Sequence, residues 1–135
     1  MDSPWRRVSD AAAATWKLGR DRRAPQVPAL PDGRHWIVTP LHVTCDDQEI
    51  SFEAGAVVEA KRGAYHGLGD HLFHLDSVRN VSLVGYGATL KMWRQDYNDP
   101  SLYAHSEGRH AIAVLGAQDV SIRGLVVSES GGDGV

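Results

Sequence analysis

The stretch Asn80-Val81-Ser82-Leu83-Val84-Gly85 reappears 39 residues later as Asp119-Val120-Ser121-Ile122-Arg123-Gly124. A further apolar segment precedes each copy, at residues 72–75 and 111–114. A weaker third copy begins near residue 50, and its Gly-Ala pair at 55–56 recurs at 87–88, 32 residues on. Short apolar segments at a nearly fixed period, separated by Gly, Asn and Asp, are typical of a solenoid of β-strands. The sequence therefore predicts an all-β fold in which strands of successive repeats stack on one another.

Ten short strands are expected in this repeat. Leu83, Leu90, Ile122 and Val127 suit a narrow interior, because alternate side chains of a strand point to the same face. Asn80 and Asp119 occupy matching corners, where we expect them to bond neighbouring backbone or to stack on the next repeat. The predicted strands are 36–38, 41–44, 49–53, 56–60, 71–75, 81–84, 88–92, 111–115, 120–122 and 125–128.

The first 30 residues differ from the rest in composition. Residues 1–23 carry a net charge of +3, whereas the remainder carries −6. A brief helical pattern runs through Val8, Ala12, Trp16 and Leu18, and prolines at 25, 28 and 31 then interrupt the chain. We predict an irregular or short helical basic tail over residues 1–30 and one β-domain over residues 31–135.

Charge and hydropathy argue against two classes of partner. A mildly acidic domain has no field that would hold nucleic acid, so we interpret the basic segment as a solvated tail. No apolar run is long enough to span a membrane, and the N-terminus does not have the pattern of a secretory signal. Cys45 is the only cysteine, so it is expected to be structural, with no intrachain disulfide.

The repeat continues to the last residues, Ser130-Gly131-Gly132-Asp133-Gly134-Val135. No polar capping segment follows, although an uncovered strand edge invites further pairing. We therefore expect the open end to be covered by further rungs of a longer parent chain or by a homo-oligomer. Isolated residues 1–135 are expected to associate or to unfold.

At this point the chain resembles a known family. The stretches NVSLVGYGATL (80–90) and DVSIRGLVVSESGGDGV (119–135) resemble repeats of right-handed parallel β-helix proteins of the pectin-lyase-like superfamily. LPDGRHWIVTPLHV and ISFEAGAVVEA resemble the entry and the first coil of such helices. The resemblance implies a right-handed parallel β-helix of about three rungs, incomplete at its C-terminus, and a secreted or cell-surface location. It also implies a polysaccharide partner, because the superfamily includes polysaccharide lyases and glycosidases.

The site residues are expected in one enlarged loop. Residues 91–110 follow the same strand position as the shorter stretch 59–71, and insertions in solenoids gather on the ligand-binding face. The loop contains groups able to transfer protons, cations that suit a uronate carboxylate and aromatic rings that suit a sugar face. The predicted catalytic residues are Asp96, Glu107, Arg109 and His110, with His105 as a further proton carrier. The predicted substrate-binding residues are Lys91, Trp93, Arg94, Tyr97, Tyr103 and Asp133.

Structural roles for these residues remain open alternatives. The aspartates near Pro100 are ordinary turn residues, the aromatic rings can pin the loop to the domain, and Arg109 can pair with Glu107 or Asp96. The family's paired aspartates and Gly-His-Gly motif are missing, since only Asp133 lies near a comparable turn. No metal site is predicted, although calcium is the ion that suits uronate-binding helices. His71 and His74 are expected to face opposite sides of a strand and so not to share a metal.

Three functions follow as hypotheses. The first is a lyase or glycoside hydrolase acting on an acidic or complex polysaccharide. The second is a non-catalytic carbohydrate-binding or tailspike-like structural module. The third is an inactive fragment without a groove.

Overall fold

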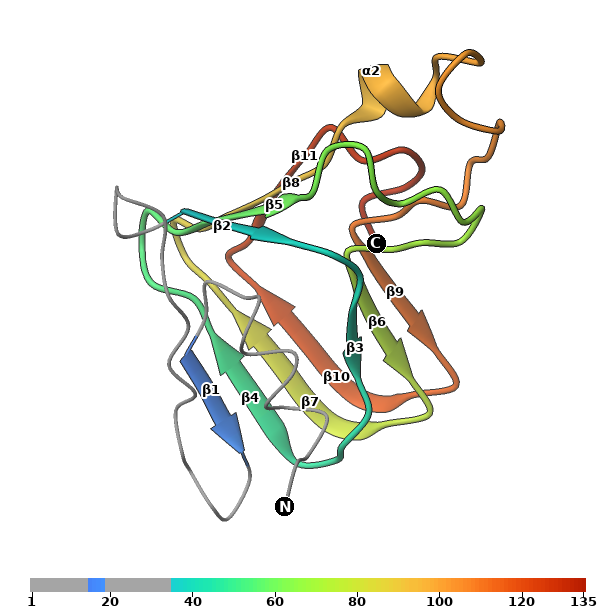
Figure 1. Cartoon of the computed structure of the whole chain (residues 1–135). Coiled ribbons are helices and arrows are strands. Elements are labelled where there is room, and N and C mark those ends of the chain that lie inside the picture. The colour runs from blue at the N-terminus through green and yellow to red at the C-terminus, as the bar shows by residue number, and fades with distance from the viewer. Residues whose placement is uncertain (1–14, 19–34) are drawn as a thin grey trace.

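The structure is a computed structural model that describes residues 15–18 and 35–135. This part of the chain is all-β apart from one short helix, and its strands form three sheets (Figure 1). The elements are β1 Thr15–Leu18, β2 His35–Val38, β3 Leu41–Val43, β4 Gln48–Ser51, β5 Val57–Ala60, β6 Phe73–Asp76, β7 Arg79–Val84, β8 Thr89–Lys91, α2 Arg94–Tyr97, β9 Ile112–Leu115, β10 Gln118–Arg123 and β11 Val126–Ser128.

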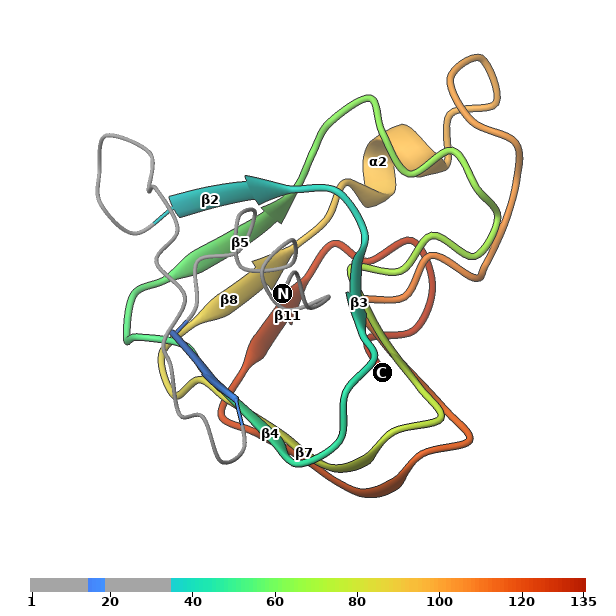
Figure 2. The ribbon, with the colours of Figure 1, turned by 60° about the horizontal axis from the view of Figure 1, so that its bottom comes forward.

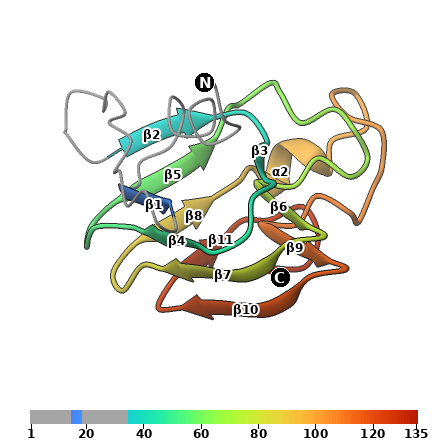
Figure 3. The same cartoon turned by 90° about the horizontal axis from the view of Figure 1, so that it is seen from below.

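Successive strands of the chain are added to the three sheets in a fixed order. Strands β2, β3 and β4 belong to three different sheets. Strands β5, β6 and β7 are added to the same sheets in the same order, and so are β8, β9 and β10. The sheets enclose a common interior (Figure 2), and the strands of each sheet lie in sequence order when the molecule is seen from below (Figure 3). All pairs among β2 to β11 are parallel, an arrangement that is compatible with a solenoid.

The repeat read from the sequence is confirmed in the strand register. Ser82, Leu83 and Val84 of β7 lie beside Ser121, Ile122 and Arg123 of β10, running in the same direction. The Gly-Ala pairs also align, since the Gly55 amide donates to the Gly87 carbonyl at 2.8 Å. All ten predicted strands are present, each with bounds within two residues of those expected.

The interior is filled by residues at equivalent positions of successive strands. Leu83 and Leu90, predicted to face inward, are fully buried. Ile122 and Val127 lie in register with them on β10 and β11 but are only half-buried. Within residues 35–135, β10 and β11 have a neighbouring strand on one side only, so the last inward-facing side chains lack a covering layer.

The predicted corner residues adopt a left-handed backbone. Asp47, Asn80 and Asp119 have φ of 58°, 57° and 55°, a region that Asn and Asp tolerate better than most residues. The Asn80 side-chain amide donates to the Asp47 carboxylate at 2.9 Å, and the Arg79 amide donates to the Asp46 carboxylate. Asn80 is therefore structural, as predicted, and its bond to Asp47 connects successive turns of the chain. Asp119 has the same left-handed backbone at the matching corner.

The expectation of a short helix near Trp16 and Leu18 is wrong for the residues described there. Residues 15–18 form strand β1, which pairs antiparallel with β4. Hydrogen bonding to the open edge of β4 satisfies backbone groups on both strands, and this outweighs a weak helical pattern of one or two turns. The remainder of the predicted tail lies outside the described residues.

Candidate functional site

Two loops share one corner of the molecule. Residues 61–72 connect β5 to β6, and residues 92–111 connect β8 to β9. Because β5 pairs with β8 and β6 pairs with β9, the larger loop lies beside the smaller one, as the repeat spacing predicts (Figure 1). The short helix α2 begins the larger loop.

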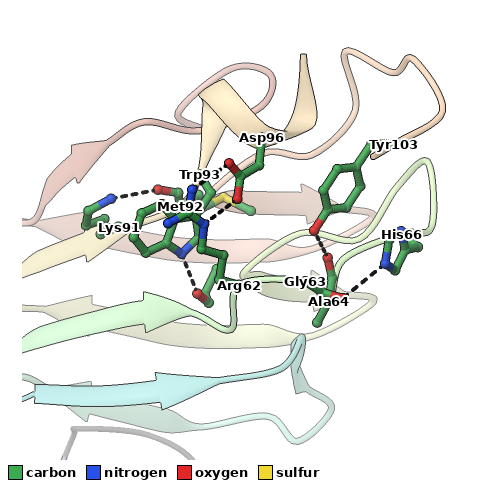
Figure 4. Close-up of polar contacts among 10 residues, drawn as sticks. Arg62, Gly63, Ala64, His66, Lys91, Met92, Trp93, Asp96 and Tyr103 are labelled. Carbon is green, nitrogen blue, oxygen red and sulfur yellow. Dashed lines mark hydrogen bonds and ion pairs between the residues drawn. The ribbon is translucent and has the colours of Figure 1, made fainter. Parts of the chain in front are cut away.

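An ion pair joins the two loops (Figure 4). The Arg62 guanidinium donates to both carboxylate oxygens of Asp96, with Nε–Oδ2 at 2.6 Å and Nη2–Oδ1 at 2.9 Å. The bond from Arg62 holds the pKa of Asp96 below its usual range, so this carboxyl group is poorly suited to donate a proton. Sequence reasoning missed Arg62, although the 32-residue spacing places it beside Arg94 and hence near Asp96.

The Trp93 ring is bonded to the end of β5 and contacts two cations. Its indole N–H donates to the Ala60 carbonyl at 2.8 Å. The Lys91 ammonium lies 3.7 Å from a Trp93 ring centroid and the Arg62 guanidinium 4.5 Å from it. Both contacts are in the range of a cation–π interaction. The ring therefore already has two charged neighbours rather than an open face for a sugar.

Arg109 is the central polar link between the loops. It is fully buried, and its guanidinium donates to the carbonyls of Tyr65, His66 and Ala104 at 2.8 to 3.2 Å. No carboxylate pairs with it among the described residues, and its Nη1 has no hydrogen-bond partner there. Three carbonyl oxygens offset part of the cost of burying this charge. Arg109 is thus directed into the protein and away from solvent.

Two tyrosines of the loop pack around this guanidinium. Tyr97 and Tyr103 are buried, with ring centroids 5.1 Å apart in an edge-to-face arrangement and each within 6 Å of the Arg109 guanidinium carbon. The Tyr103 hydroxyl donates to the Ala64 carbonyl at 2.6 Å (Figure 4). Burial raises the pKa of Tyr97 to about 12. These rings pin the larger loop onto the smaller one, the alternative left open above.

A polar pocket of about 470 Å³ opens on the other side of the larger loop. It lies between residues 94–107 and the segment that follows β11. Three predicted site residues meet here, namely Arg94, Glu107 and Asp133, together with the proton carrier His105. Asn98 and Ser106, which the sequence did not single out as ligands, also line it. Asp96, Lys91, Trp93, Tyr97, Tyr103, Arg109 and His110 are not among the residues that line this pocket.

Two features fix the wall of this pocket. Gly132 approaches the larger loop so closely that an added Cβ would clash with the Glu107 carbonyl oxygen, so only glycine fits. The Arg94 guanidinium donates through Nε to the Ser130 carbonyl at 2.9 Å. The segment carrying Asp133 is therefore attached to the loop carrying Glu107 and Arg94.

Four histidine rings contact one another in a row, the histidine stack, beside sheet β3-β6-β9. The outer two pairs are stacked, and the His71 and His74 rings between them are tilted at 52°. Ring centroids are 4.3 Å apart for His42 and His74, 4.5 Å for His74 and His71, and 4.9 Å for His71 and His110. The expectation that His71 and His74 face opposite sides is wrong. His71 precedes β6, so strand alternation does not govern its side chain, and its backbone amide donates to the His74 ring at 3.1 Å.

This stack makes stability depend on pH. Burial and the neighbouring histidines lower the pKa of His71, and they lower that of His74 to about 4. The unfolded chain, with histidine near 6.5, therefore binds more protons between pH 6.5 and 4, so stability present above pH 6.5 is lost as pH falls through that window. Both rings are partly solvated, which screens the effect, and we expect a loss of about 1 kcal/mol.

Urea unfolding at pH 7.5 and 5 measures this loss. Replacing His74 by glutamine should reduce the difference between the two pH values. An unfolding free energy of H74Q that falls with acid as steeply as that of the unmodified protein would contradict the assignment.

No group of three or more His, Cys, Asp or Glu side chains suited to a metal ion is found within the described ranges. The acidic pair at Asp46 and Asp47 bonds the Arg79 amide and the Asn80 side chain at a corner. Cys45 is half-buried and free. No helix in the described part of the chain is long and apolar enough to cross a membrane.

Comparison with known proteins adds no assignment. No protein-family model, no curated protein and no solved structure matches the chain.

Proposed function

We propose that this chain forms a right-handed parallel β-helix of about three rungs and that it binds an acidic polysaccharide at the Glu107–Asp133 pocket. The three parallel sheets, the repeated strand register and the resemblance to pectin-lyase-like repeats support the fold. The observation that carries the function is one pocket lined by Arg94, His105, Glu107 and Asp133.

The chemistry of the lining suits a uronate sugar. Arg94 is the cation of this pocket, and it offers guanidinium donors to a carboxylate. Asn98 and Ser106 offer neutral hydrogen bonds of the kind that sugar hydroxyls accept and donate. A pocket of about 470 Å³ falls within the range of small-molecule sites.

The same lining supports cleavage of the polymer. In a glycosidase, Glu107 and Asp133 are the two carboxyl groups, one protonating the leaving oxygen and the other acting as base or nucleophile. In a lyase, His105 or Glu107 removes the proton next to the uronate carboxyl group while Arg94 stabilises the enolate. Cleavage of the glycosidic bond follows by elimination, which leaves an unsaturated sugar.

A second candidate is a non-catalytic carbohydrate-binding or tailspike-like module. It is favoured by the roles of Arg109, Tyr97, Tyr103 and Trp93, which the loops use to hold each other together. In this reading the pocket binds a sugar unit without cleaving the chain. The open edges of β10 and β11 then take up further parallel strands, from additional rungs or from a partner copy of this chain.

Replacing Glu107 by glutamine tests the catalytic reading. The protein is incubated with polyuronates, and both the ultraviolet absorbance of unsaturated products and the number of new reducing ends are measured. Absorbance indicates a lyase, and reducing ends without absorbance indicate a hydrolase. E107Q should lower the rate about 100-fold, because proton transfer from a positioned group contributes that much or more.

Asp99 provides the matched control. It lies in the same loop, and its carboxylate bonds Ser101 rather than lining the pocket. D99N should therefore retain the rate of the unmodified protein. Binding of the polymer without any cleavage would favour the second candidate, and absence of both binding and cleavage would refute the proposed function.

A further inference from the structure

His71, His110 and Asp133 occupy equivalent places on three successive turns of the chain. The amide of Phe73 donates to the carbonyl of Ala111, and the amide of Ile112 donates to that of Gly134. These bonds place residues 71, 110 and 133 one above the other, two residues before Phe73, Ile112 and Val135 respectively. The rings of His71 and His110 are nearly parallel, at an interplanar angle of 6°.

One hydrogen bond repeats along this column. The backbone amide of His110 donates to Nδ1 of His71 at 3.2 Å, and the backbone amide of Asp133 donates to Nδ1 of His110 at 2.8 Å. A ring nitrogen accepts a hydrogen bond only when it carries no proton. The geometry therefore requires neutral imidazoles with their protons on Nε2, and a protonated ring cannot make either bond.

The bond from the Asp133 amide to His110 holds the segment 131–134, of which residues 131–133 form one wall of the pocket. Residues 131–134 are attached to the larger loop by the Gly131 amide on the Arg109 carbonyl and by the Asp133 amide on His110, and to β9 by the Ile112 amide on the Gly134 carbonyl. The His110 bond is the central one of the three. Losing it frees the backbone of the residue that carries a pocket carboxylate.

We propose that His110 is a proton-sensitive latch on the pocket, which positions Asp133 when the ring is neutral and releases the 131–134 segment when the ring is protonated. The inference deepens the proposed function, since it supplies regulation of the same pocket. It rests on the proposed function only for the consequence that sugar binding weakens in acid. The latch itself is a property of the fold.

Several titratable and polar groups lie along the column formed by His71, His110 and Asp133. The His71 ring stacks against the His110 ring on one side, and the Asp133 backbone amide bonds to Nδ1 of His110. The Glu107 backbone carbonyl lies against Gly132, which itself approaches His110 Nδ1. Further along the stack the titratable groups are His42, His74, Asp70 and Asp76.

The test measures protection of the Asp133 amide by NMR solvent exchange from pH 8 to pH 5, with the Leu83 amide in the core as reference. In the unmodified protein the protection factor of Asp133 should fall at least tenfold in acid, while Leu83 stays protected. H110N keeps an acceptor in place of Nδ1 that cannot be protonated, so Asp133 should keep its protection at both pH values. H110A should leave Asp133 unprotected throughout.

Nitrogen chemical shifts of the His110 ring provide a reading that needs no variant. At pH 8 they should report the Nε2–H tautomer. For the exchange experiment, H35N is a control that changes a histidine outside the stack, and it should not alter the pH dependence of the Asp133 protection factor. A Nδ1–H tautomer, an Asp133 protection factor that ignores pH, or a parallel loss at Leu83 would overturn the latch. Because no sugar is needed, the latch and the proposed function fail independently.

Discussion

Replacing Arg109 by alanine should destabilise the protein by about 3–5 kcal/mol, measured as the free energy of unfolding in urea. The fully buried guanidinium supplies the donors for three carbonyl groups of the loop pair. Its removal leaves those oxygens without partners and opens a cavity beside Tyr97 and Tyr103. Lysine should not rescue the loss, because a single ammonium group cannot reproduce the planar fork.

Arg123 is the matched control for this experiment. It lies on β10 with its side chain exposed, and its alanine variant should change the unfolding free energy by no more than about 0.5 kcal/mol. If R109A were as stable as R123A, the loops would not depend on Arg109. The residue would then be free for the catalytic role first expected from the sequence.

A second large effect is expected in the interior. Leu83→Ala should cost about 3 kcal/mol, since Leu83 is fully buried between β4 and β10. Ile122→Ala removes a side chain at the register position directly above, where the residue is only half-buried, and should cost about 1 kcal/mol. Chemical denaturation of both variants gives the comparison.

The ratio between these two losses of unfolding free energy shows whether the free edge of β10 is covered in solution. Equal losses would mean that Ile122 is as well covered in solution as Leu83. In that case another layer of strands packs on β10, and the proposed partner copy would already be bound. A dimer detected by light scattering at the same concentration would identify it.

Most of the architecture could be predicted from the sequence because repetition makes the register explicit. The 39-residue step brought β7 beside β10, and the left-handed corners at Asn80 and Asp119 followed from residue type. Strand β1 could not be predicted, because its pairing depends on the open edge of β4 rather than on its own pattern.

The candidate site was less predictable for a physical reason. Residue type suggests which chemistry a loop can perform, but not whether a side chain points to solvent or into the neighbouring loop. Tyr103 and Arg109 satisfy carbonyl groups of the smaller loop, a need that arises only when two irregular segments lie side by side. Trp93 bonds the last carbonyl of β5 in the same way. Glu107 and Asp133 come together because Gly132 permits a close approach.

The central claim, that equivalent segments of the repeat lie side by side and in parallel, can be tested directly by interstrand nuclear Overhauser effects on isotope-labelled protein. The register predicts contacts linking residues 81–84 with residues 120–123 in ascending order, Leu83 opposite Ile122. Contacts in descending order, or none between the two segments, would contradict the fold and remove the basis for the pocket at its corner.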